Sequence, residues 1–251
     1  MRGTLYLVPA PLDFGCAQEG PLADVMPDGT LRVAARLQHW VAENAKTARA
    51  FLKRVHATHP LAHPLQQLAI HELPRDVHKK GDHRVAFDAR PLLGAALSGQ
   101  DMGLVSEAGM PAVADPGSSV VRAAHELGIA VVPLVGPASL LLALAASGLN
   151  GQEFAFVGYL PQQPAPRLQR LRELETLALR TGQTQLFIET PYRNSAVWGS
   201  LMEGLRPTTR VAVASGLTLQ HPRLASRTVA QWRGMPVPVD DQVPAVFLLG
   251  V

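Results

Sequence analysis

The segment LVSEAGMPAVADPGSS, residues 104–119, decides the fold class of this chain. An aliphatic strand over residues 103–106 leads into a loop rich in glycine and proline, after which a helix begins at Ser118, its predicted N-cap. In α/β folds, ligands bind in such loops at the carboxyl ends of strands. Glycine lets the backbone approach a ligand closely and proline stiffens the loop. The loop is therefore a candidate binding site, although a plain strand-to-helix connection explains it equally well.

The same alternation of strand and helix extends over the first 150 residues. Apolar patterning and turn residues predict four further strands, at residues 4–8, 40–42, 68–72 and 129–135. They predict five helices, at residues 30–38, 44–56, 91–97, 118–127 and 137–146.

The second half of the chain has a different pattern. Strands are predicted at residues 154–159 and 184–189, and helices at 167–180 and 194–205. Three strand-like segments follow at 210–214, 223–230 and 245–251, with no helix between them. The pattern predicts two α/β domains, each a mixed sheet flanked by helices. The turn Asp115-Pro116-Gly117 marks the predicted boundary, giving domains at residues 1–116 and 117–251.

Composition narrows the class of protein. Charged residues make up 17% of the chain, below the roughly 25% that is usual, which favours a surface partly covered by a second subunit. The lone Cys16 excludes an internal disulfide and disfavours a zinc site. The N-terminus lacks the pattern of a signal peptide, and the longest apolar stretch is interrupted by Pro133, Gly136 and Pro137, so no membrane span is predicted. The net charge of +3 permits an RNA partner without requiring one.

Three more segments contain candidate site residues. Gly136-Pro137 ends a strand, and Ser139 lies in the first turn of an apolar helix, where anions are favoured. Glu189 ends another strand, where it can bind a ligand or cap the next helix. In the third segment, Glu43 and Lys46, with Arg49, follow one another at spacing three and share one predicted helix face, which is either solvated or directed into the site. No GxGxxG, Walker A, HExxH or GxSxG motif is present.

The order TLYLVPAPL, VAEN, LVSEAGMPAVADPG, VVPLVGPASLLLALAASGL, FAFVGYLP and LFIETPYR resembles the tetrapyrrole methylase superfamily. Within it, the chain is most similar to the branch of ribosomal RNA small subunit methyltransferases that act on a ribose 2′-hydroxyl of 16S rRNA. That branch typically carries SDAGTP, GPS and ESP at the corresponding positions.

The resemblance implies a cytoplasmic, homodimeric methyltransferase that binds S-adenosylmethionine in a cleft between two α/β domains and needs no metal. It assigns the cofactor to a set of residues from four motifs: Pro9, Ser106, Glu107, Ala108, Gly109, Met110, Pro111, Gly136, Pro137, Ala138, Ser139, Glu189 and Pro191.

The chain departs from the family pattern on the acceptor side. The AEDTR of the family is replaced by Ala42-Glu43-Asn44-Ala45-Lys46, and the Gly-Asn after the first strand is absent. The cofactor side changes less, with Glu107 in place of Asp and Met110 in place of Thr. The chain therefore resembles a divergent member, in which the donor is easier to assign than the acceptor.

Methyl transfer to a hydroxyl gains from positioning and from a general base. The candidate bases are Glu43 and Glu189, and Lys46 or Arg49 could hold a phosphate or polarise the acceptor. Three hypotheses remain. The first is an RNA methyltransferase, and the second is a methyltransferase of a tetrapyrrole or another small molecule. The third is a cofactor- or RNA-binding relative without catalysis.

Overall fold

The computed structural model describes residues 1–13, 16–80, 82 and 87–251, and it divides the chain into two compact units. The first unit contains most of the chain up to Pro137, and the second contains Ala138–Val251 together with residues 16–19. This division differs from the boundary predicted at Asp115-Pro116-Gly117. It lies later because strand β5 (Ala130–Pro133) pairs with β1 (Thr4–Leu7) and so completes the first sheet.

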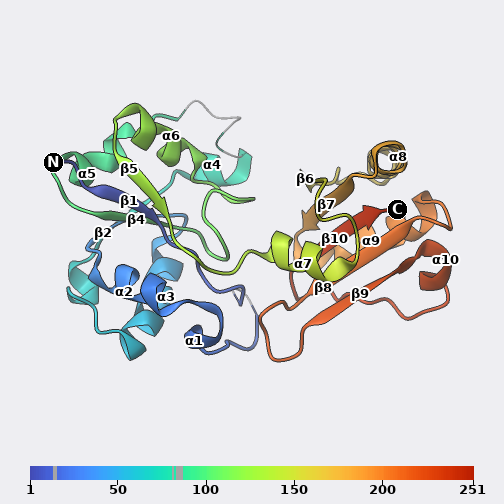
Figure 1. Cartoon of the computed structure of the whole chain (residues 1–251), viewed down its shortest axis with the longest axis horizontal. Helices are drawn as coiled ribbons and strands as arrows, with labels where there is room; N and C mark the ends of the chain where they lie inside the picture. The colour runs from blue at the N-terminus through green and yellow to red at the C-terminus, as the bar shows by residue number, and fades with distance from the viewer. Residues whose placement is uncertain (14–15, 81, 83–86) are drawn as a thin grey trace. The chain divides into compact units, whose positions relative to one another are not determined.

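A five-stranded sheet forms the middle of the first unit, in the order β3-β2-β4-β1-β5 (Figure 1). Its other strands are β2 (His39–Ala42), β3 (Ala69–Glu72) and β4 (Met102–Val105). All four strand pairs are parallel, whereas the sequence pattern predicts a mixed sheet. Each connection is long enough to return the chain to the same end of the sheet, as parallel pairing requires.

Helices cover both faces of this sheet. On one face, Leu31 of α2 (Asp28–Arg36) and Leu52 of α3 (Ala45–Thr58) pack with Trp40 of β2. On the other, Ala96 of α5 (Gly94–Leu97) and Val120 of α6 (Ser118–Glu126) belong to the same cluster as Val41. The adjacent residues Trp40 and Val41 enter opposite clusters because successive strand side chains alternate between faces.

The second unit is built on a mixed sheet, in the order β6-β7-β10-β8-β9. Its strands are β6 (Phe154–Tyr159), β7 (Thr184–Glu189), β8 (Arg210–Ser215), β9 (Arg223–Thr228) and β10 (Ala245–Gly250). Only the β6–β7 pair is parallel among these four pairs. The mixed sheet predicted for the second half of the chain is confirmed.

Helix α7 (Ser139–Ser147) lies on one face of this sheet, where its Leu144 packs with Leu186 and Leu248. Helices α8 (Pro164–Thr181) and α9 (Asn194–Gly204) cover the other face. There the rings of Phe187 and Phe247 stack with their centroids 5.6 Å apart.

Most of the elements predicted from sequence are present, with three differences. The short helices α1 (Leu22–Val25) and α4 (Arg75–Lys80) lie in segments for which no helix was predicted. The predicted strand at 223–230 ends at Thr228, because that residue begins helix α10 (Val229–Trp232). Thr228 and Gln231 form a capping box there, a local signal that the strand pattern obscured.

Candidate active site

The carboxyl ends of β1 and β4 bring two loops of the first unit together. Beyond β1, the backbone N–H of Ala10 donates to the carbonyl of Gly109 at 2.9 Å, and the N–H of Gly109 donates back to Ala10 at 2.9 Å. Val8 N donates to the Leu104 carbonyl at 2.8 Å. The glycine-rich loop predicted to bind a ligand is therefore paired with the segment that follows the first strand.

Two glycines allow this close packing. Gly109 has a φ of +71°, a backbone conformation that favours glycine, and a Cβ there would lie 3.3 Å from Leu12 Cδ2. At Gly136, a Cβ would lie only 2.2 Å from Pro9 Cγ, so a side chain cannot fit without moving the backbone. Pro9, Gly109 and Gly136, predicted from three separate motifs, thus belong to one region of the first unit.

Glu43 lies between the end of β2 and the start of α3. Its carboxylate accepts a hydrogen bond from the backbone N–H of Glu107 at 3.3 Å, which ties it to the glycine-rich loop. The helix itself begins at Ala45, because Asn44 is the N-cap and its Oδ1 accepts from the N–H groups of Lys46 and Thr47. The prediction that Glu43 shares a helix face with Lys46 and Arg49 is therefore wrong, and Lys46 projects from the first turn as an exposed side chain.

Asp115 is a candidate site residue that the sequence motifs did not single out. It is partly buried in the loop between β4 and α6, and burial raises the pKa of its carboxyl to about 7, with further contributions from the charges of Glu43 and Glu107. The sequence pattern assigned the turn Asp115-Pro116-Gly117 to a domain boundary. The sequence signal that could have identified Asp115 is the position of an acidic residue inside a Gly/Pro-rich loop that follows a strand.

A second aspartate anchors the end of that loop. Asp82 is buried, and its Oδ2 accepts from the N–H of Gly117 at 3.0 Å and of Ser119 at 2.7 Å. It therefore caps α6, for which the sequence pattern predicts Ser118 as the N-cap. Because Asp82 is distant in sequence from α6, no local pattern could have predicted this cap.

A third aspartate closes the loop that follows β1. Both carboxylate oxygens of Asp13 accept from the guanidinium of Arg54, at 3.0 and 2.9 Å, and Asp13 also accepts from Gly20 N at 3.2 Å. Bidentate pairs of this kind are strong and geometrically specific. The pair thus ties Asp13, which follows the first-strand motif, to helix α3.

In the second unit, Glu189 is already bound by neighbouring groups. Its carboxylate lies 3.0 Å from an Arg193 guanidinium nitrogen and accepts from Thr190 N at 2.9 Å and Thr190 Oγ1 at 3.2 Å. The side chain is buried, so these contacts offset its charge. Pro191 begins the short 3₁₀ helix Pro191–Arg193, while Ala138 and Ser139 form the start of α7.

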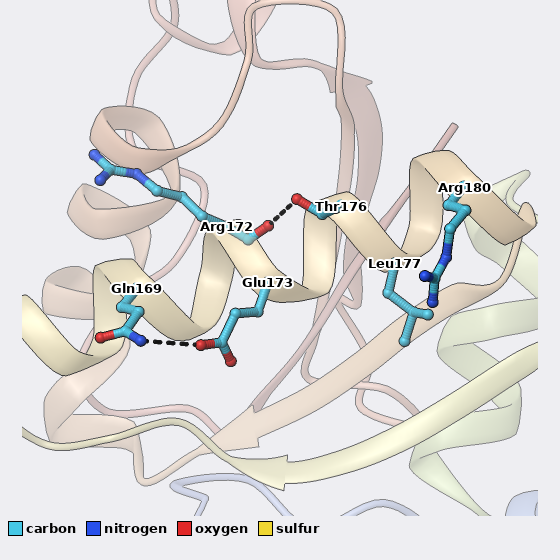
Figure 2. Close-up of a pocket in the computed structure, with 6 residues that line it drawn as sticks. All are labelled: Gln169, Arg172, Glu173, Thr176, Leu177 and Arg180. Atoms are coloured by element: carbon cyan, nitrogen blue, oxygen red, sulfur yellow. Dashed lines mark hydrogen bonds between the residues drawn. The ribbon is translucent and has the colours of Figure 1, made fainter.

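The outer face of α8 carries a shallow depression (Figure 2). Its lining residues all come from this one helix: Gln169, Arg172, Glu173, Thr176, Leu177 and Arg180. Arg172 and Arg180 are exposed and stand eight residues, or about 12 Å, apart along the helix. Arg167, by contrast, is buried, and it donates to Ser200 Oγ at 2.8 Å and to the Gln162 carbonyl at 3.0 Å.

In the part of the chain that the structure describes, no helix is long and apolar enough to span a membrane. Among the same residues, no group of three His, Cys, Asp or Glu side chains is arranged to hold a metal ion.

The fold matches solved structures over its whole length. A crystal structure of the methyltransferase CobJ covers 99% of this chain and 94% of its own, with a TM-score of 0.57 and 22% sequence identity. A native uroporphyrin III C-methyltransferase from Thermus thermophilus covers 99% and 97%, with a TM-score of 0.55 and 17% identity. At these identities the likeness extends to the fold alone.

Sequence relatives are more specific. The chain is 33% identical to ribosomal RNA small subunit methyltransferase I of Mesorhizobium japonicum over 91% of its own length and 68% of the relative. The protein of the same name from Bacillus subtilis is 29% identical, over 99% of this chain and 75% of the relative. The one from Pseudomonas aeruginosa is 34% identical over 76% of this chain, and the match covers only 58% of the relative's length.

The family model for tetrapyrrole (corrin/porphyrin) methylases matches residues 30–232, most of the chain and parts of both units. That match, together with relatives above 30% identity, agrees with the motif order in the sequence and with the two-sheet fold. The chain therefore belongs to the tetrapyrrole methylase family, a family of S-adenosylmethionine-dependent methyltransferases.

Proposed function

We propose that this protein transfers a methyl group from S-adenosylmethionine to a ribose 2′-hydroxyl of RNA. The observation that carries the proposal is the paired loop at Ala10 and Gly109, which joins the two segments of this chain whose motifs resemble those of ribosomal RNA methyltransferases. The names of those relatives support ribosomal RNA as the acceptor.

The donor would be held mainly by the loop after β4. Ser106 is buried, and its Oγ has no hydrogen-bond partner among the described residues, so a ligand could complete its hydrogen bonding. Pro111 in the same loop is buried and apolar, and Gly109 and Gly136 let the backbone pack closely against Leu12 and Pro9. This donor set fits a nucleoside with a polar tail, and when bound, S-adenosylmethionine supplies an electrophilic methyl group.

The remaining candidates have supporting roles in the donor site. Glu107, Ala108 and Met110 would line it together with Pro9 and the Gly136-Pro137 turn. Ala138, Ser139, Glu189 and Pro191 belong to the second unit, and the resemblance alone assigns them to the donor. Ala138 and Ser139 form the start of α7, and the Glu189 carboxylate is paired with Arg193.

On the acceptor side we place Glu43 and Lys46. Glu43 fixes the glycine-rich loop through Glu107 N and so orients whatever binds there. Lys46 is exposed in the first turn of α3, where its charge can contact a phosphate of the acceptor. A homodimer in the cytoplasm, where ribosomes are assembled, completes the proposal, and the low charged fraction supports the dimer.

Binding and transfer are measured separately. Calorimetry with S-adenosylhomocysteine is expected to give a Kd of about 1 µM, a binding free energy of about −8 kcal/mol. Tritium from labelled S-adenosylmethionine is then followed into the RNA, protein and small-molecule fractions of a bacterial extract.

Label in ribosomal RNA at a ribose oxygen supports the proposal. Label in a small-molecule fraction alone would replace RNA with a tetrapyrrole or similar acceptor. Binding without transfer to any fraction would indicate a non-catalytic relative.

A further inference from the structure

We propose that Tyr159 and Tyr192 form a stacking surface for unpaired bases of the RNA acceptor. This role rests on the proposed function, because it requires RNA as the acceptor. Neither tyrosine has a part in the donor site or the acceptor site described above. Their role follows from their exposure, from their positions at the ends of two neighbouring strands, and from the charge of the surrounding surface.

Exposed aromatic side chains are few in this protein. Of those that the structure describes, only Phe154, Tyr159 and Tyr192 are exposed, at 42%, 56% and 70%. The other described aromatic side chains are buried or half-buried. A single exposed ring is common on protein surfaces, whereas exposed rings on adjoining segments indicate a binding surface.

The two tyrosines lie at the same edge of the second sheet. Tyr159 is the last residue of β6, where it is in register with Ile188 of β7. Tyr192 lies just beyond β7, in the 3₁₀ helix Pro191–Arg193. Because β6 and β7 are parallel neighbours, their carboxyl ends meet at one edge (Figure 1). Loops at this edge are where α/β sheets bind ligands.

Two arginines hold the segments that carry the tyrosines. Arg193, which follows the second tyrosine, donates to the Pro161 carbonyl, two residues after the first, at 3.4 Å. The same guanidinium lies 3.0 Å from the Glu189 carboxylate. Arg167 donates to the adjoining Gln162 carbonyl at 3.0 Å. The two segments are therefore joined and fixed, so binding does not have to order their backbone.

The charge of this part of the chain favours RNA over a protein partner. Residues 138–251 contain ten arginines, no lysine and seven acidic residues, so their net charge of +3 equals that of the whole chain. Two of the acidic side chains, Glu175 and Glu189, are buried, but only one of the arginines is. Arg170 and Arg172 are exposed in the first half of α8, the helix that follows β6. Basic surfaces with exposed aromatic rings bind single strands, through phosphates and bases respectively.

The bases that these rings accept are unpaired ones. In a duplex each base is already stacked between its neighbours, whereas bases in loops and single strands can turn outward onto an aromatic side chain. Stacking tolerates any sequence, because every base has a π-face. Tyr159 and Tyr192 are therefore positioning residues for a single-stranded acceptor, and they take no part in the chemical step.

The experiment measures the binding of a fluorescent single-stranded 16S rRNA fragment by anisotropy. Tyr159→Ala and Tyr192→Ala are each expected to weaken binding at least about fivefold, the lower limit for loss of one stacked base. Tyr159→Phe and Tyr192→Phe keep the rings and are expected to bind as the unchanged protein does. Phe154→Ala is the matched control, because it removes an exposed ring at the other end of β6, about 17 Å away, and it should bind normally.

Three further measurements separate stacking from other causes. The salt dependence of binding is expected to stay the same in the alanine variants, since no phosphate contact is lost. Binding of a fully paired duplex of the same sequence should be equal in the variants and the unchanged protein. Affinity for S-adenosylhomocysteine should also be equal, and its loss would move the tyrosines from the acceptor to the donor and overturn the stacking role.

The stacking role alone would be overturned by alanine variants that bind the single strand as tightly as the unchanged protein. It would equally be overturned by phenylalanine variants that bind as weakly as the alanine ones. If the unchanged protein binds no RNA, single-stranded or paired, the proposed function fails, and the stacking role with it. The two failures are therefore distinguishable.

Discussion

At the residue scale, Asp115 links the chemistry of the site to the stability of the fold. Its pKa of about 7 in the folded protein lies above its ordinary value of 3.8. Between these values the folded state binds more protons than the unfolded state, so stability falls as the pH rises. The stability that proton binding at Asp115 contributes is fully present below about pH 4 and is lost as the pH rises past 7.

Because stability falls as Asp115 ionises, the substitution Asp115→Asn is expected to change the stability of the protein. Asparagine is similar in shape and carries no charge, so it removes the cost of an ionised carboxylate beside Glu43 and Glu107. The variant is expected to be more stable than the unchanged protein at pH 8, by an amount below about 4 kcal/mol, with the gain shrinking toward pH 4. Thermal unfolding at both pH values measures it, with Asp24→Asn as control. A gain that is the same at both pH values would contradict the raised pKa.

Gly109 provides a second prediction at this scale. Its φ is +71°, and a Cβ at this position would already lie 3.3 Å from Leu12 Cδ2, which leaves no room for a branched side chain. Gly109→Val is expected to abolish S-adenosylhomocysteine binding in calorimetry, because the loop must shift away from Ala10.

Gly151→Val is the matched control, since no atom lies within 4 Å of a Cβ at that position. It should bind normally. Full binding by Gly109→Val would place the donor elsewhere in the protein.

At the element scale, helix α8 separates the arginines that can contact RNA from those that cannot. Arg167, Leu171, Leu174 and Ala178 recur on one stripe of the helix, and all four are buried. From the sequence, the basic residues of this helix are expected to contact RNA phosphates, and the burial of Arg167 in the structure excludes it as such a contact. Arg172 and Arg180 lie on the exposed side (Figure 2).

Replacing Arg172 and Arg180 together by alanine is therefore expected to weaken RNA binding and reduce its salt dependence. Each lost phosphate contact lowers the slope of log K against log salt by about 0.7 to 0.9. Fluorescence titration of a 16S rRNA fragment over a range of salt concentrations measures the slope. Arg122→Ala, at an exposed position of α6, is the control. An unchanged slope in the double variant would remove α8 from the RNA-binding surface.

Local sequence patterns predicted the bounds of helices and strands better than they predicted the contacts between segments that are distant in sequence. Strands β6 and β7 begin and end at the predicted residues because turn residues flank their apolar runs. The predicted domain boundary lies earlier in the chain than the observed one, because the pairing of Thr4 with Ala130 is a contact between segments that are distant in sequence. The caps formed by Asp82 and the pair of Asp13 with Arg54 also join distant residues, so spacing along the chain could not reveal them.

At the scale of the whole molecule, the first prediction is a homodimer. Only 17% of the residues are charged, and family resemblance supports the same state. A stable two-fold interface should bury more than about 1,000 Å² in total. Light scattering coupled to size exclusion is expected to give twice the chain mass of 26.9 kDa, and a value near 26.9 kDa at micromolar concentration would contradict the dimer.

The last prediction concerns the acceptor. Around the start of α3, the chain differs from the resembling ribosomal enzymes at Asn44, Ala45 and Lys46. Asn44 keeps a structural role as the N-cap, and Ala45 N donates to Glu72 at 2.7 Å, so the helix start does not depend on the family residues. What changes is the group presented to the acceptor, because Lys46 is a point charge where an arginine can form a bidentate fork.

We therefore expect this protein to restore the family's 16S rRNA ribose methylation only weakly in a bacterium that lacks the ribosomal enzyme. Loss of one well-placed polar contact costs about 1 to 3 kcal/mol, and each 1.4 kcal/mol lowers the rate about tenfold. Mapping of ribose methylation measures the outcome. Lys46→Arg restores a guanidinium that can form two hydrogen bonds at once, and it should raise the extent of methylation. Full methylation by the unchanged protein would show that these three positions do not select the acceptor.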